Sequence, residues 1–257
     1  MRLLVALILT AFIGLTGDAE AGRQGTGSNP TIGDGASTFE IFVSDTDIDD
    51  AWELIVQDDS TWTQIPTNSN MVVNPAGNDS VAVTISGLLA DSTYAVVSST
   101  FGEGGATSGN RDISGITWYA IENWFIQDEH SADISLARNG FPATPVSHID
   151  AGDLWQGPAQ VFFGSKNQGY LEEVQFGLLG TGTVTFEVRV YPDFKDIRDI
   201  GDGYYIIAKA YVVSGESPVT IDLHNKYIGS NAVVQVWALG AAANASGWAK
   251  LVGRRNR

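Results

Sequence analysis

Apolar residues along the chain fall mostly in short runs, and Gly, Asn, Asp or Pro follows nearly every run. Alternating runs, or continuous runs of about four to eight residues, are typical of β-strands. Little of the chain shows the 3.6-residue period of a helix. Twelve segments fit the strand pattern: 39–44, 52–57, 81–86, 94–101, 116–126, 159–164, 171–179, 184–191, 204–213, 219–223, 233–239 and 248–253. We therefore expect an all-β protein.

The segment "VTFEVRVY" (184–191) is a clear example of a strand with two different faces. Side chains alternate between the two faces of a strand. One face therefore carries Val184, Phe186, Val188 and Val190, and the other carries Thr185, Glu187, Arg189 and Tyr191. This pattern predicts a half-buried antiparallel strand.

Composition divides the chain into residues 1–21, a lead-in and two modules. Residues 22–38 have no apolar pattern and are expected to be a flexible lead-in. "FGEGGATSGNRD" (101–112) is rich in Gly, Ser and Thr, which is typical of a linker or long loop. Two modules are therefore expected, 39–112 and 113–257. The second holds about eight strands, as in a jelly roll.

The stretch "VAVTISGLLADSTYAVVSST" (81–100) resembles one corner of a fibronectin type III or immunoglobulin-like sandwich. Gly87 and Leu88 end one strand, and Tyr94 follows six residues after the leucine. In such a tyrosine corner the hydroxyl group bonds upstream backbone. Ala90 stands where this family usually has proline, and the early-strand tryptophan is assigned to Trp52. The resemblance implies a sandwich fold for residues 39–112 and says little about function.

The closing stretch "NKYIGSNAVVQV" resembles the last strands of β-sandwich domains in bacteriophage surface proteins. Such domains often carry an aromatic and a basic residue before a turn that contains glycine. The expected fold is thus an immunoglobulin-like sandwich followed by a jelly-roll-like β-sandwich.

The first 21 residues have the layout of a secretory signal peptide. Arg2 precedes an apolar run from Leu3 to Leu15, and Ala19-Glu20-Ala21 offers a cleavage site before Gly22. The apolar run is short for a bilayer span, which needs about 20 residues. The alternative is that this run stays in the protein as a buried element. A cleaved leader would leave no membrane anchor.

Charge and cysteine content narrow the possible partners. The chain has 14 Lys and Arg against 30 Asp and Glu, a formal net charge of −16. Nucleic acids and anionic membranes bind clustered Lys and Arg, so they are not expected as partners. Without cysteine, no disulfide framework, thiolate metal site or Cys nucleophile can form.

An acidic loop is the candidate metal site. In "SDTDIDD" (44–50), Asp45, Asp47 and Asp49 stand at alternate positions. Alternate carboxylates in a loop can converge on Ca²⁺, which takes six to eight oxygen ligands. The EF-hand pattern is absent, so the alternative is a solvated turn. No other cofactor is indicated.

Trp118, Glu122 and Trp124 share one face of a strand if side chains alternate strictly. They would form either a platform for a surface glycan or aromatic packing in the core. Glu122 is also the best single candidate for an acid in glycoside hydrolysis, which needs two carboxylates across a cleft. No partner carboxylate is identifiable, and no nucleotide or hydrolase motif occurs. No catalytic residue is therefore assigned.

The chain ends in a basic segment that could serve in assembly. Lys250, Arg254, Arg255 and Arg257 follow a strongly acidic body. They could dock on the acidic face of a neighbouring subunit, or be a solvated terminus.

These patterns together favour a non-enzymatic protein of an exterior surface that acts by assembly or adhesion. One setting is the virion surface of a bacteriophage, as a head-decoration or tail-fibre component. The other is an exported bacterial adhesin, carbohydrate-binding module or filament subunit. An exported glycoside hydrolase ranks third. The expected partners are other subunits, in a homo-oligomer, virion or filament, and the expected location is extracellular or the virion surface.

Overall fold

The computed structural model describes residues 36–57, 62–75, 81–101, 111–126, 130, 133–151, 153, 155–192, 203–216 and 218–256. These residues form sixteen strands arranged in antiparallel sheets, which confirms the all-β class. None of the described segments is a helix of the length and hydropathy needed to cross a bilayer.

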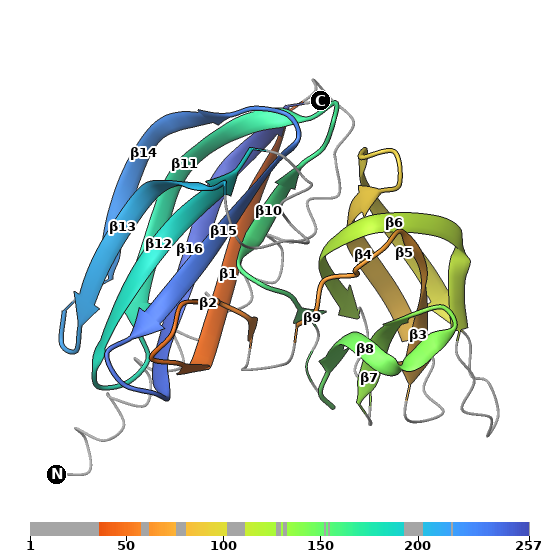
Figure 1. Ribbon diagram of the computed structural model, residues 1–257, viewed down its shortest axis with the longest axis horizontal. Coiled ribbons are helices and arrows are strands. Elements are labelled where there is room, and N and C mark those ends of the chain that lie inside the picture. Colours follow the sequence, from red (N-terminus) through yellow and green to blue (C-terminus); the bar gives the residue numbers. More distant parts are fainter. Residues whose placement is uncertain are drawn as a thin grey trace, which may run out of the picture.

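Nine strands build a sandwich of two sheets (Figure 1). They are β1 (Ala36–Ile48), β2 (Glu53–Leu54), β10 (Gln160–Phe163), β11 (Gln168–Leu178), β12 (Thr183–Tyr191), β13 (Tyr205–Val213), β14 (Val219–Ile228), β15 (Ala232–Gly240) and β16 (Ala245–Asn256). One sheet has the order β1-β16-β11-β14, and the other β10-β15-β12-β13, with the short β2 also pairing with β15. Without β2, each sheet has four strands, and strands that follow one another in the chain mostly lie in opposite sheets, as in two Greek keys. This is the strand order of a jelly roll.

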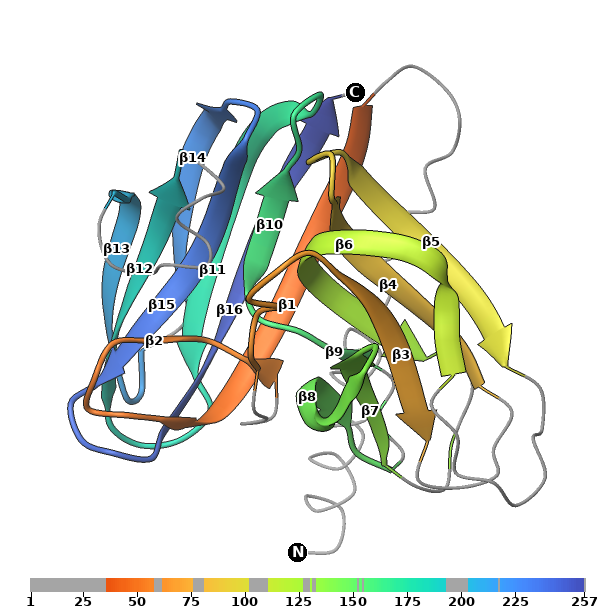
Figure 2. The ribbon, with the colours of Figure 1, turned by 45° about the vertical axis from the view of Figure 1, so that its right-hand side comes forward.

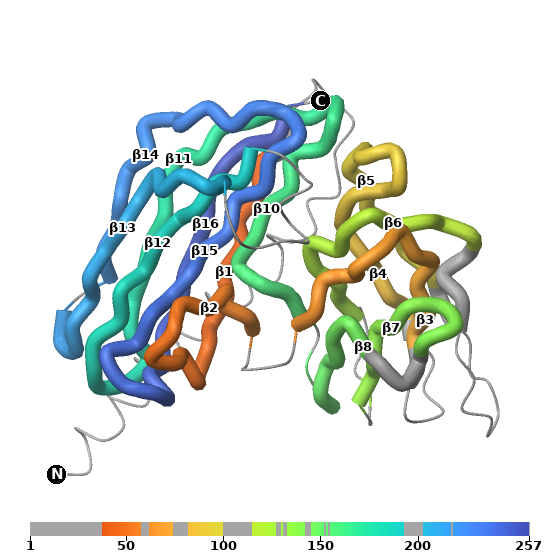
Figure 3. Tube along the Cα trace, viewed as in Figure 1, coloured from red at the N-terminus to blue at the C-terminus, as the bar shows by residue number. Residues whose placement is uncertain are grey.

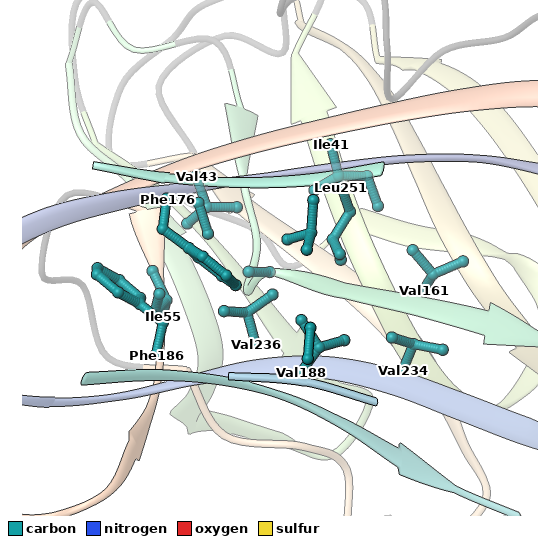
Figure 4. Close-up of a cluster of buried hydrophobic side chains, with 14 of the residues drawn as sticks. Ile41, Val43, Ile55, Val161, Phe176, Phe186, Val188, Val234, Val236 and Leu251 are labelled. Carbon is teal, nitrogen blue, oxygen red and sulfur yellow. The ribbon is translucent and has the colours of Figure 1, made fainter. Parts of the chain in front are cut away.

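The jelly-roll core lies between the two sheets, where alternate residues of each strand point inward (Figure 4). Phe176 of β11 stacks on Phe186 of β12, with ring centroids 4.9 Å apart. As expected from alternation, Val184, Phe186, Val188 and Val190 all lie in this core. The opposite face of β12 is also largely covered, since Glu187, Arg189 and Tyr191 are buried as well.

The remaining seven strands form a second module with a core of its own (Figure 2). They are β3 (Ser69–Pro75), β4 (Val81–Leu89), β5 (Tyr94–Phe101), β6 (Arg111–Ile126), β7 (Ile134–Arg138), β8 (Phe141–Ile149) and β9 (Trp155–Gln156). Their order is β5-β4-β6-β3-β7-β8, and β9 pairs with β6. The long β6 bends through this sheet, pairing with β4 on one edge and with β3 and β9 on the other.

This second module is inserted into the jelly roll between β2 and β10, as the chain trace shows (Figure 3). The outgoing and returning segments lie side by side at the insertion point. Val56 bridges to Pro158, the amide of Gln57 donates to the carbonyl of Gly157 (3.2 Å), and the amide of Ala159 donates to the carbonyl of Ile55 (2.8 Å). The two segments that connect the insertion to the jelly roll are therefore hydrogen-bonded to each other.

The expected division into modules 39–112 and 113–257 is wrong, because residue 112 lies inside β6. β1 pairs along its length with the last strand, β16, rather than with β3, β4 or β5. Residues of the first strand thus fold with the C-terminal half of the chain, and the module between them is the insertion.

Candidate functional site: the junction of the two modules

The outer face of the five-stranded sheet receives the inserted module. Phe162 of β10, Tyr191 of β12 and Val233 of β15 point away from the jelly-roll core and pack against Leu88 and Ala120 of the insertion. All five side chains are buried. The junction therefore has an apolar patch, and burial of this patch favours a fixed arrangement of the two modules.

A buried carboxylate lies beside this patch because of irregular pairing in β6. Asn123 pairs with Ser86 and Ile121 with Gly87, so Glu122 has no partner of its own on β4. Such an extra residue is a β-bulge, which redirects side chains that would otherwise alternate. Glu122 is thereby turned toward the jelly roll, while Trp118 and Trp124 stay in the core of the insertion.

Four donors occupy the two oxygens of Glu122. Oε1 accepts hydrogen bonds from the amide of Phe162 (2.7 Å) and from the guanidinium of Arg255. Oε2 accepts from the hydroxyl groups of Tyr94 (2.6 Å) and Ser86 (3.3 Å). The donors come from β10 and β16 of the jelly roll and from β4 and β5 of the insertion. The carboxylate thus joins both modules.

Arg255 reaches this carboxylate from the inner face of β16, near the end of the sandwich. Its Nε donates to the carbonyl of Phe162 (3.1 Å), and its guanidinium lies 4.1 Å from the centroid of the Tyr94 ring. Burial alone would lower the pKa of Arg255, but the carboxylate of Glu122 outweighs it and the pKa is raised. The guanidinium is therefore held in its charged form.

Tyr94 is the third member of this group. Burial raises the pKa of its hydroxyl; the positive charge of Arg255 opposes this rise and the carboxylate of Glu122 adds to it. The hydroxyl is thus a neutral donor at physiological pH. It bonds a side chain rather than upstream backbone, so the bond implied by the tyrosine-corner resemblance is not the one this hydroxyl makes.

A row of amides continues the junction across the five-stranded sheet. Gln160 Nε2 donates to the backbone carbonyls of Ile121 and Glu122, each at 3.0 Å. Gln235 Nε2 donates to Gln160 Oε1 (3.2 Å), and Trp237 Nε1 donates to Gln235 Oε1 (3.0 Å). These buried polar groups satisfy one another, as buried groups must to avoid a desolvation penalty.

A second charged group on the same outer face was not anticipated from the sequence. Glu187 accepts hydrogen bonds from Arg189 (2.8 Å from Nη2) and Lys209 (2.8 Å). Burial acts to raise the pKa of Glu187, but the bonds from Lys209 and Arg189 outweigh it and the pKa is lowered. The guanidinium of Arg189 also lies 4.5–4.8 Å from the ring centroids of Trp52, Tyr204 and Trp237. The alternating charges Glu187 and Arg189 were the available signal, because two opposite charges on one strand face can pair.

The proposed sugar platform is not present. Trp118 and Trp124 are fully buried in the core of the insertion, and Glu122 no longer shares their face. The two bulges in the β4–β6 pairing break the strict alternation on which the platform depended. Both tryptophans instead pack in the core, which was the alternative interpretation of this strand.

The described basic side chains of the tail form ion pairs with glutamates of the same chain. Lys250 pairs with Glu40 (2.7 Å), Arg254 pairs with Glu172 (2.6 Å), and Arg255 pairs with Glu122. Arg257 lies outside the described residues, as does the expected leader, residues 1–21. The tail is part of the central strand β16, and Arg255 is buried there, whereas Lys250 and Arg254 stay partly exposed. Docking of this segment on the acidic face of a neighbouring subunit stays a prediction.

The acidic stretch 44–50 is mostly strand and not loop, because Asp45 and Asp47 lie at the end of β1. Both oxygens of the buried Asp45 accept amide hydrogen bonds, Oδ1 from Asp47 (3.0 Å) and Oδ2 from Val56 (3.2 Å). Across the described residues, no three His, Asp or Glu side chains are grouped so as to hold a metal ion. Calcium binding by Asp45, Asp47 and Asp49 stays a prediction.

Glu53, the first residue of β2, is an acid beside this stretch that sequence reasoning missed. Burial, followed by the negative charges of Asp45, Asp49 and Asp47, raises its pKa to about 7, although the amide of Asp49 donates to it. The clustering of five acids within nine residues, 45–53, was the signal.

The comparisons with known proteins assign no family to this chain. No family model matches this chain, and no curated protein matches it. One solved structure with a weak similarity is titled "Structure of infectious bursal disease virus Gx strain". It is 10% identical over 86% of this chain and 69% of that chain, with a TM-score of 0.19. A score this low carries no argument about fold or function.

Proposed function

We propose that this protein is a non-enzymatic structural subunit of an exterior surface, namely a component of a bacteriophage virion surface of the head-decoration or tail-fibre type. The observation that carries the proposal is the jelly roll with a second β-module inserted and locked against it. Jelly rolls occur in viral capsid and lectin domains.

The chemistry of the junction supports a structural role. A general acid must exchange its proton with a substrate, whereas both oxygens of Glu122 are bonded to groups of the protein itself. Glu122 was the residue on which the hydrolase alternative depended, and its pairing with Arg255 supplies a different reason for its presence. The charged groups described above hold β-sheets together.

An exported bacterial adhesin, carbohydrate-binding module or filament subunit is the second candidate. It is favoured by the order of residues 1–21, with Arg2, an apolar run and Ala19-Glu20-Ala21. Mass spectrometry of the native N-terminus separates the two candidates. An intact Met1 in assembled particles supports the virion component, and a chain that starts at Gly22 supports export.

Assembly itself is tested by size-exclusion chromatography with light scattering on the purified protein. We expect a mass larger than one chain, 27.4 kDa, that increases with concentration. A strict monomer at millimolar concentration would contradict the proposed role in either setting.

A further inference from the structure

The turn between β7 and β8 holds the one Asn-Gly dipeptide of this sequence, Asn139-Gly140. Arg138 and Phe141 pair across the turn, so the dipeptide forms the tip of the hairpin. Asn139 and Gly140 are both exposed, and the φ angle of Gly140 is +83°. Glycine adopts such an angle without strain, which explains its place in this turn.

The same dipeptide brings together the two groups of a known backbone reaction. The backbone nitrogen of the residue after an asparagine can attack the side-chain carbon Cγ and close a five-membered ring. A side chain on that following residue hinders the attack, and glycine has none. Beyond its two chain neighbours, no heavy atom lies within 4 Å of the position that a Cβ of Gly140 would occupy. The surroundings of the attacking nitrogen are therefore open.

Hydrogen bonding in the turn leaves this nitrogen available. The amide of Asn139 donates to the carbonyl of Asn70 on β3 (2.8 Å), and the side chain of Asn70 in turn accepts from Thr117 (2.9 Å). Within the described part of the chain, by contrast, no backbone carbonyl accepts a hydrogen bond from the amide of Gly140. Ring closure thus starts without breaking such a bond at the reacting nitrogen.

We propose that Asn139 is a site of spontaneous modification, at which the folded protein converts this asparagine into isoaspartate and aspartate. The nitrogen of Gly140 bonds to Cγ of Asn139, the bond from Cγ to the side-chain nitrogen breaks, and the proton of Gly140 leaves with the ammonia. Water then opens the cyclic imide. Addition at the backbone carbonyl carbon gives isoaspartate, and addition at Cγ gives aspartate. Water is the only other reactant.

The two products affect the hairpin differently. Both place a carboxylate beside Arg138, whose guanidinium lies 4.3 Å from the ring centroid of Phe141. Isoaspartate also adds a carbon atom to the main chain of this tight turn, so Arg138 and Phe141 can no longer pair as they do now. Since β8 is the edge of its sheet and pairs with β7 in the described strands, we expect the disturbance to stay in this hairpin.

Incubation of the folded protein at neutral pH, followed by peptide mass spectrometry, tests the site. We expect the peptide with Asn139 to gain the mass difference between water and ammonia before the peptide with Asn244 does. Asn244 is the internal control, because it is exposed in the turn before β16 but precedes Ala245. Equal conversion at both asparagines, or conversion of Asn139 in urea but not in the folded protein, overturns the proposal.

Two variants test the route. We expect Gly140→Ala to slow conversion at least about tenfold, which corresponds to about 1.4 kcal/mol of barrier, because the methyl group hinders the attack. Asn139→Gln keeps the glycine and would need a larger ring, so we expect no gain of mass in this peptide. Near-ultraviolet circular dichroism verifies that both variants are folded. An unchanged rate in Gly140→Ala overturns the ring-closure route.

Amide hydrogen exchange on the separated isoaspartate form tests the effect on the hairpin. We expect residues 134–138 to lose protection in this form and to keep it in Asn139→Asp, which has the charge without the longer main chain. Unchanged exchange in the isoaspartate form contradicts this effect. None of these results depends on assembly, so a strict monomer would contradict the proposed function and leave the modification site standing.

Discussion

At the residue scale, the ion pair between Glu122 and Arg255 is the contact that most directly fixes one module on the other. Both residues could be singled out from the sequence, but in unrelated roles. Nothing local in the sequence links a glutamate of β6 to an arginine 133 positions later. One signal was available: Arg255 occupies an inward-facing position at the end of an alternating strand, where a charge needs a buried partner.

A double-mutant cycle measures this pair. Removing one partner leaves an uncompensated buried charge, which costs about 3–5 kcal/mol. We expect Glu122→Leu and Arg255→Met each to lower the free energy of unfolding by about this amount, and the double variant to lose much less than the sum. Urea denaturation provides the values.

Lys250→Met is the control for this cycle, because Lys250 and Glu40 form a more exposed pair. Surface pairs contribute about 0–1 kcal/mol. Strictly additive losses in the Glu122 and Arg255 variants would show that the two groups do not act as a pair.

Glu53 predicts a pH dependence of stability. Its pKa of about 7 in the folded protein lies above the ordinary value of 4.5, so the folded state binds more protons than the unfolded state between these pH values. Its contribution to stability therefore falls as pH rises through this window. We expect wild-type protein to lose more stability between pH 5 and pH 8 than Glu53→Gln does, in urea titrations at both pH values. Equal losses would show that Glu53 has an ordinary pKa.

At the element scale, all twelve segments predicted from apolar patterning contain strands, and four strands were missed. The missed strands are β3, β7, β8 and β9, all in the insertion. β8 contains Pro142 and Pro145, and a proline inside an apolar run argues against a strand except at an edge. β8 is an edge strand, so both prolines are tolerated. β9 has two residues, too few for any periodic signal.

The close approach of β4 and β6 at Gly87 makes a prediction at this scale. A Cβ atom at this position would lie 2.3 Å from the carbonyl oxygen of Ala120. Gly87→Ala should therefore separate the strands and cost about 1–3 kcal/mol, as overpacking does. Gly180 lies in a turn with no atom within 4 Å of such a Cβ, so Gly180→Ala is the control and should be close to neutral in thermal denaturation. Equal melting temperatures for both variants would contradict this packing.

At the scale of the whole molecule, class and rough strand positions were predictable, whereas the domain organisation was not. Apolar patterning is local, and it says nothing about which strand pairs with which. The Gly-rich stretch 101–112 reads as a linker, yet the structure continues the same sheet on both sides of it through β5 and β6. The real transition lies at the bridge between Val56 and Pro158, and the pattern of apolar residues does not mark it.

The pairing of the first strand with the last closes the jelly roll, and the place of the insertion within the fold depends on it. Because the chain has no cysteine, a pair of introduced cysteines can test this closure. Glu40 and Val252 lie opposite each other on β1 and β16. Directly opposite residues have Cβ atoms about 4.5–5.5 Å apart, close to disulfide geometry.

Mild oxidation of Glu40→Cys/Val252→Cys should give an intramolecular disulfide, detected as loss of both free thiols in a single chain by mass spectrometry. Glu40→Cys/Ser98→Cys, which joins β1 to β5, should stay reduced. A disulfide in the second pair but not in the first would place β1 with the strands of residues 39–112 and contradict the inserted architecture.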